Sequence, residues 1–168
     1  EYVNNTSDGF NLTTIHPGMV FGPLLNEDLD GASASLIANM IKGKFPAIPN
    51  VYFTVVDVRD VAKIHVSSLK NQLSDNKRII VTSQNGISFM EISNTLRDLG
   101  YTKSPKNLIP DKVINSLAPF NKEMRSTASM IKRGCYDTDI SETLSIYNWE
   151  PIPIKKTLED MTKSISGS

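Results

Sequence analysis

The chain has 168 residues, which is enough for one domain with a hydrophobic core and too few for two large ones. The 18 Lys and Arg residues balance the 18 Asp and Glu residues, so the charge gives no indication of binding to nucleic acid or to an anionic membrane. The sequence shows no apolar run of membrane-spanning length, no signal peptide and no second cysteine to pair with Cys135, so we expect a soluble, cytoplasmic protein.

The first predicted element is a strand over residues 12–15 that runs into a loop. Its β-branched residues favour a pleated strand, and Pro17 and Gly18 then interrupt it. In an open α/β sheet, ligands bind just outside the carboxyl ends of the strands, and a glycine there lets a flat ligand approach the main chain. The loop is therefore a candidate binding segment, although an ordinary exit from a strand has the same composition.

The next two regular segments each combine a periodic pattern with an end signal. Apolar residues recur at helical spacing over residues 33–42, with Ser33 in the position of an N-cap. A strand over residues 52–56 then leads into a helix, and Asp57 at the junction can accept hydrogen bonds from the first free amides of that helix. His65 shares the apolar face of this second helix, so we expect it to be buried in the core. The acidic loop at residues 26–30 has no regular ligand spacing, which favours a solvated loop over a cation site.

A further strand and helix follow, and the rest of the chain is predominantly helical. The strand spans residues 77–82, and Ser88 with Glu91 forms a capping-box pattern at the start of the next helix. This alternation of strands and helices is typical of a layered α/β fold. Beyond residue 100, helices are predicted near residues 111, 124–131, 140–147 and 154–165, with Trp149 expected in the core.

The chemistry-bearing motifs that the sequence lacks narrow the possible functions. The two histidines and the single cysteine have no zinc-binding spacing, and neither G-x-x-x-x-G-K nor G-x-G-x-x-G is present. There is no G-x-S-x-G, and none of the five tyrosines is followed by a lysine four positions later. The sequence therefore predicts no catalytic residue and no metal site in this chain.

Three stretches together resemble a known family. They are residues 15–23 (IHPGMVFGP), residues 56–62 (VDVRDVA), and residues 139–141 (DIS) with 149–151 (WEP). Their order and spacing are similar to those in the carboxyl-terminal half of extended short-chain dehydrogenases/reductases, the NAD-dependent epimerase/dehydratase superfamily, and most of all in its dihydroflavonol-reductase-like branch.

The resemblance implies an α/β fold containing the last part of a Rossmann-type parallel sheet together with the smaller α/β substrate-binding domain. On this interpretation residues 1–168 form the substrate-binding portion, and the amino-terminal nucleotide-binding part is absent. Residues 1–5 resemble the end of the helix that carries the family's catalytic tyrosine and lysine.

The resemblance also implies which residues line the site. Cofactor-contacting positions would be Pro17, Gly18, Met19, Val20 and Ser33. Positions in the substrate pocket would be Met19, Phe21, Leu36 and Met40, with core packing as the alternative for the last two. The cofactor would be NADP or NAD.

The complete protein is thereby expected to be an NAD(P)H-dependent reductase of an aldehyde or ketone, while this chain alone would be inactive. Two alternatives stay open, namely a nucleotide-sugar epimerase/dehydratase fragment and a non-catalytic binding or assembly module. Because the strand at residues 12–15 should have neighbours in the absent part, we expect either the missing amino-terminal half or a second copy as its partner.

Overall fold

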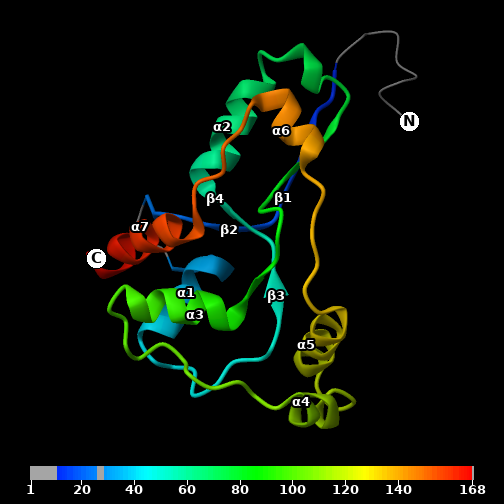
Figure 1. The fold of residues 1–168 in the computed structure, drawn as a ribbon. Helices are drawn as coiled ribbons and strands as arrows, with labels where there is room; N and C mark the ends of the chain where they lie inside the picture. The colour runs from blue at the N-terminus through cyan, green and yellow to red at the C-terminus, as the bar shows by residue number, and fades with distance from the viewer. Residues whose placement is uncertain (1–10, 26–28, 168) are drawn as a thin grey trace.

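The computed structural model describes residues 11–25 and 29–167. Residues 1–5 and residues 26–28 of the acidic loop lie outside these ranges, so the predictions made for them fall on residues that the structure does not describe. The elements follow one another as β1 (Thr14–Pro17), β2 (Met19–Phe21), α1 (Ala32–Ile41), β3 (Tyr52–Phe53), β4 (Val55–Asp57), α2 (Val58–Ser68), the 3₁₀ turn η2 (Gln72–Ser74), β5 (Arg78–Val81), β6 (Ile87–Ser88), α3 (Phe89–Asp98), α4 (Asp111–Leu117), α5 (Lys122–Arg133), α6 (Ser141–Tyr147) and α7 (Ile154–Ser166) (Figure 1).

The strands associate in three pairs. β1 pairs in parallel with β5, with Ile15 opposite Ile79, and β2 pairs in parallel with β4, with Val20 opposite Val56. β3 and β6 form a short antiparallel pair. Each parallel pair needs a crossover between its strands, and helices α1 and α2 lie in these crossovers. The layered α/β architecture expected from the sequence is therefore present.

The β2–β4 pair divides the hydrophobic core into two parts. Successive side chains of a strand point to opposite faces, so Phe21 and Val55 join a larger core built with α1, α3 and α7. Val20 and Val56 instead pack in a smaller core with α2, β5 and α6. In Figure 1, α1 and α3 accordingly lie below these two strands and α2 and α6 lie above them.

The two strongest capping predictions are confirmed. Asp57 Oδ1 accepts a hydrogen bond from the backbone N–H of Arg59 at 2.8 Å and caps α2. Ser88 and Glu91 form the reciprocal capping box of α3, with Ser88 Oγ accepting from Glu91 N at 3.0 Å and Glu91 Oε2 accepting from Ser88 N at 2.7 Å.

Four other local expectations were wrong or only partly right. Residues 19–21 form strand β2 and not a loop, because Met19 immediately takes a new strand partner. Helix α1 begins at Ala32 with glycine as its N-cap, so Ser33 lies within the first turn. His65 is exposed, because α2 is rotated so that Ile64 faces inward. Trp149 is half-buried at the margin of the smaller core.

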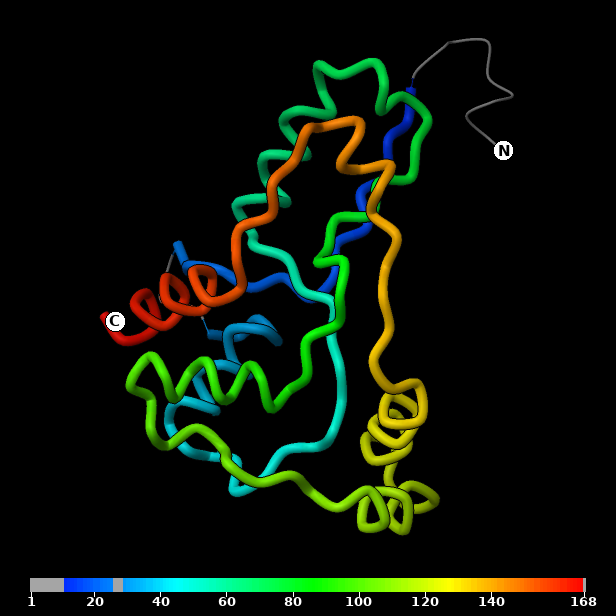
Figure 2. The backbone as a smooth tube through the Cα atoms, viewed as in Figure 1, coloured from blue at the N-terminus to red at the C-terminus, as the bar shows by residue number. Residues whose placement is uncertain are grey.

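Helices α4 and α5 pack on each other at the opposite end of the molecule from α2 and α6 (Figure 1). Figure 2 shows the two long connections that link this helix pair to the rest of the chain, one before α4 and one after α5. Within the part of the chain that the structure describes, no helix has both the length and the apolar character needed to cross a membrane.

Candidate functional site

The candidate site is built around Gly18, where the chain leaves one parallel pair and enters the other. The backbone N–H of Gly18 donates to the carbonyl of Val81 at 3.0 Å, which extends the β1–β5 ladder by one residue. The next N–H, that of Met19, donates to the carbonyl of Thr54 at 2.8 Å at the start of the β2–β4 ladder. A crevice of the kind that binds ligands in α/β folds is expected where strands diverge in this way.

The packing of neighbouring segments of the chain requires a glycine at position 18. A Cβ atom at this position would meet the Oγ1 atom of Thr82 and would lie 2.5 Å from the carbonyl oxygen of Thr54. The glycine therefore allows two neighbouring segments to approach its main chain. This internal contact accounts for a glycine at position 18, and the approach of a flat ligand to its main chain stays a prediction.

The residues predicted to contact the cofactor are partly accessible. Pro17 is exposed at the carboxyl end of β1, and Gly18, Met19 and Val20 are half-buried. The accessible end of β1 next to β5 therefore fits a contact with one end of a nicotinamide cofactor. A glycine-rich turn of the kind that holds a pyrophosphate does not occur in the sequence.

A cavity of about 280 Å³ brings three predicted site residues together. Val20 and Phe21 line it from β2, and Ser33 lines it from the first turn of α1. The opposite walls are provided by Val58 and Met161. The structure therefore places residues that were assigned separately to the cofactor and to the substrate against the same small space.

The other predicted pocket residues lie elsewhere. Met40 has no exposed surface and is buried in the larger core, so its position favours core packing, the alternative that the sequence left open. Leu36 and Met19 are half-buried beside the same core and do not line the cavity that contains Ser33. All these assignments to ligand binding stay predictions.

A charged network fixes the end of β4 close to this cavity. Asp57 accepts hydrogen bonds from the side chains of Arg59 (2.7 and 2.9 Å) and Thr157 (2.7 Å). Arg59 also donates to Asp160 at 2.7 Å and so ties α2 to α7. Burial alone would raise the pKa of Asp57, but the hydrogen bonds from Arg59 and Thr157 hold it below the usual value of an aspartate. With its oxygens occupied in this way, Asp57 holds two helices together and is not free to act as a general base.

Sequence reasoning missed the groups that surround Gly18. Thr54 and Thr82 have no local motif, and only the three-dimensional structure brings them to the glycine. Among the described residues, no group of three or more His, Cys, Asp and Glu side chains could hold a metal ion.

Comparisons with known proteins give several matches to reductases. No family model matches the chain. It is 36% identical over 86 residues to an uncharacterized oxidoreductase of Schizosaccharomyces pombe, covering 49% of this chain and 25% of that protein. It is 32% identical over 105 residues to cinnamoyl-CoA reductase CAD2 of Medicago truncatula, covering 62% of this chain and 30% of that protein. The matched regions therefore span about a quarter to a third of these relatives' length.

Solved structures match over nearly the whole chain. Gre2 from Candida albicans, determined in complex with NADPH, superposes with a TM-score of 0.69 at 23% identity, covering 97% of this chain and 46% of that one. UDP-glucose 4-epimerase from Thermotoga maritima superposes with a TM-score of 0.66 at 17% identity, covering 96% of this chain and 48% of that one. The likeness confirms the predicted fold class, an α/β fold like that of Rossmann-type reductases, over a length equal to about half of theirs.

Proposed function

We propose, from the premise that this chain belongs to the short-chain dehydrogenase/reductase (NAD-dependent epimerase/dehydratase) superfamily, that it is the carboxyl-terminal, substrate-binding part of an NADPH-dependent carbonyl reductase. Residues 1–168 form this part, and the nucleotide-binding turn and catalytic groups belong to an amino-terminal part outside this sequence. A relative from Aspergillus novofumigatus named as a ketoreductase and a structural neighbour named as a yeast methylglyoxal/isovaleraldehyde reductase support a ketone or aldehyde substrate. The NADPH bound to Gre2 supports the choice of NADPH over NADH.

The observation that carries the proposal is the exposed end of β1 at the divergence of the two parallel pairs. Pro17 is accessible there, and Gly18 is held by one hydrogen bond to the β5 side. The bound cofactor supplies the hydride, whose transfer depends on close alignment with the carbonyl carbon. In this chain, Pro17 to Val20 and Ser33 position the nicotinamide, while Met19, Phe21 and Leu36 provide apolar walls that exclude water from the substrate.

A first test is the activity of the complete protein. We expect NADPH oxidation with a panel of aldehydes and ketones, followed by the loss of absorbance of the reduced nicotinamide. We expect NADH to be a poorer hydride donor. The 168-residue chain assayed in parallel should be inactive, because the proton donor lies outside it.

The alternative reaction is supported by the epimerase match. Turnover of a UDP-sugar by the complete protein, with no carbonyl in the panel consuming NADPH, would replace carbonyl reduction by epimerisation or dehydration. Calorimetry of NADPH binding to the 168-residue chain separates both enzymes from a binding module. Tight binding to this chain alone would contradict the assignment of the nucleotide site to an absent part.

The open strand edge predicts association. Parallel strands are usually covered on both faces and flanked by further strands, but within the described residues β1 pairs only with β5. Next to it, Ile80 of β5 is 40% exposed. We therefore expect the isolated chain to self-associate or to bind the amino-terminal part, as measured by size-exclusion chromatography with light scattering. A monomer that also fails to bind a separately expressed amino-terminal part would contradict this expectation.

A further inference from the structure

The outer side of α2 carries an apolar stripe that is exposed in this chain. It consists of Val58, Ala62, His65, Val66 and Leu69, which recur at the spacing of one helix face. All five are exposed, Val66 to 60% and Leu69 to 84%. An amphipathic helix normally turns its apolar side toward a protein core. An exposed side that stays apolar over the whole length of α2 therefore indicates that another surface packs on it.

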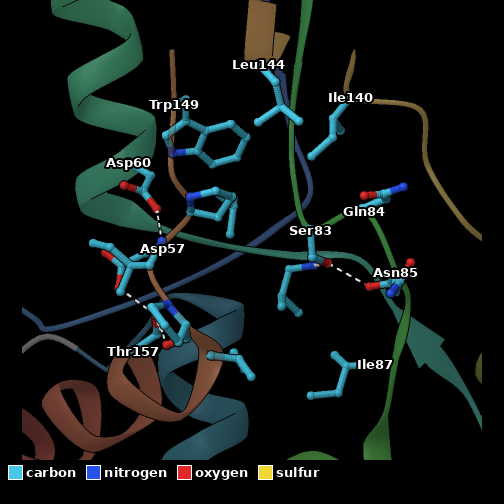
Figure 3. A pocket seen from close by; sticks show the side chains of 16 residues that line it. Asp57, Asp60, Ser83, Gln84, Asn85, Ile87, Ile140, Leu144, Trp149 and Thr157 are labelled. Atoms are coloured by element: carbon cyan, nitrogen blue, oxygen red, sulfur yellow. Dashed lines mark hydrogen bonds between the residues drawn. The ribbon is translucent and has the colours of Figure 1, made fainter. Parts of the chain in front are cut away.

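The inner side of α2 is already occupied by residues of this chain. Ile64 is buried in the smaller core. One turn earlier, Oδ2 of Asp60 accepts a hydrogen bond from the backbone N–H of Ile152 at 2.8 Å (Figure 3). One turn later, the hydroxyl groups of Ser68 and Tyr147 form a hydrogen bond at 2.7 Å. Asp60, Ile64 and Ser68 thus define the side of the helix that faces away from the stripe.

The larger cavity of the structure also lies on the inner side of α2. It has a volume of about 390 Å³, compared with about 280 Å³ for the cavity beside Ser33. β4, the start of α2, the connection from β5 to β6 and residues 140–157 form its walls, with Trp149 among them (Figure 3). Of the described residues of α2, Asp60 alone lines this cavity. The stripe is therefore a separate surface.

The neighbours of α2 show which way the stripe faces. Ile64 of α2 shares the smaller core with Ile15 of β1 and Ile79 of β5, so α2 lies over both strands. Helix α6 packs beside α2 on the β5 side, where Thr143 Oγ1 donates a hydrogen bond to the carbonyl of Ile80 at 2.7 Å. Because α6 occupies this side, the stripe on the other side of α2 faces the edge of β1 that is unpaired among the described residues.

The chemistry of the stripe fits an apolar partner. It contains no Lys, Arg, Asp or Glu. Its histidine, His65, has Nδ1 at 2.8 Å from the carbonyl oxygen of Val61, within hydrogen-bond distance in the same helix. Val66 and Leu69 present side chains that gain free energy when they are removed from water. The apolar side of a second helix provides a surface of this kind.

We propose that the stripe on α2 is the docking surface for a helix of the amino-terminal part of the complete protein. Parallel sheets are covered by helices on both faces, so a strand added at the free edge of β1 brings its covering helix next to α2. The matched solved structures have room for such a helix, because this chain covers only 46% of Gre2 and 48% of the epimerase. The inference rests on the proposed function in one respect, namely that a nucleotide-binding part belongs to the same protein.

The test compares the thermal unfolding of one variant in two proteins. In the 168-residue chain Leu69 is 84% exposed, so Leu69→Ala should change the unfolding temperature by about 1 °C or less. In the complete protein the docked helix covers Leu69, and the same variant should lower the unfolding temperature by about 4 °C or more. Leu117→Ala, on α4 at the opposite end of the molecule, is the matched control and should shift both proteins equally. Circular dichroism verifies that each variant is folded.

Two results would overturn the proposal. One is a small shift for Leu69→Ala in both proteins, and the other is an equally large shift in both, which would mean that a second copy of this chain covers the stripe. If Leu69→Ala does not fold in the complete protein, Val66→Thr, which keeps the size of the side chain, is measured in the same way with the same expectations. The measurement involves no NADPH. A complete protein that shows the expected difference but reduces no carbonyl would therefore contradict the proposed function alone.

Discussion

Replacing Gly18 with alanine is expected to lower the free energy of unfolding by about 3 kcal/mol, at the upper end of the usual range for overpacking. The new Cβ atom would lie 2.5 Å from the carbonyl oxygen of Thr54, and the side chain of Thr82 blocks it as well. A backbone carbonyl cannot move aside as a flexible side chain can, so β1 and β2 must separate from their partners. Urea denaturation followed by circular dichroism measures the loss.

Gly31→Ala is the matched control for this variant. The nearest atom to a Cβ at position 31 is that of Ala34 at 4.0 Å, and Gly31 is only an N-cap without a side-chain hydrogen bond. We expect a change of about 0.5 kcal/mol. If Gly18→Ala lowered the free energy of unfolding no more than Gly31→Ala does, the close approach of Thr54 and Thr82 to Gly18 would be contradicted.

Replacing Asp57 with asparagine should lower the free energy of unfolding by about 2–3 kcal/mol. The variant keeps the size of the side chain but leaves Arg59 without its buried anion and puts an amide group where two oxygens accept hydrogen bonds. The hydrogen bond from Thr157, at 2.7 Å, joins α7 to this point, so the packing of that helix is weakened too. The exposed Asp98, in the last turn of α3, provides the control: Asp98→Asn should change stability by about 0.5 kcal/mol or less.

The unmodified protein and the Asp57→Asn variant should differ less in their free energy of unfolding at low pH than at neutral pH. Because the pKa of Asp57 is lower in the folded than in the unfolded chain, its ionised form stabilises the protein above the unfolded value of about 4, and this stabilisation is lost as the pH falls through the folded value. The asparagine variant has no such group. The difference in unfolding free energy between the unmodified protein and Asp57→Asn should therefore shrink as the pH falls below about 5 and through the folded pKa of Asp57. A difference that stays constant over this range would show that the charge of Asp57 is unimportant.

Features fixed by neighbours in the sequence could be predicted, because their physical cause is local. The cap at Asp57 and the box formed by Ser88 and Glu91 follow from side chains that reach amides two or three residues away. The family resemblance likewise depended on short motifs and gave the fold class correctly. His65 was misplaced for a physical reason: the inward face of α2 includes the buried Asp60, so a search for an apolar stripe selects the wrong face of the helix.

Features that depend on distant segments could not be predicted. The crowding at Gly18 is caused by Thr54 and Thr82, which approach it only after β4 and β5 have paired. Strand β2 was missed because Pro17 and Gly18 were taken as the end of strand structure, whereas pairing with β4 starts a new strand at Met19. The larger cavity, with Trp149 at its wall, is assembled from separate parts of the chain that share no motif.

The most direct test of the nicotinamide contact is hydrogen exchange in the complete protein with and without NADPH. If Pro17 to Val20 contact the cofactor, peptides covering β1 and β2 should exchange more slowly when NADPH binds, while peptides from α5, at the far end of the molecule, should be unchanged. Saturating NADPH that protects other segments and leaves residues 14–21 unaffected would contradict the assignment of this segment to the cofactor site.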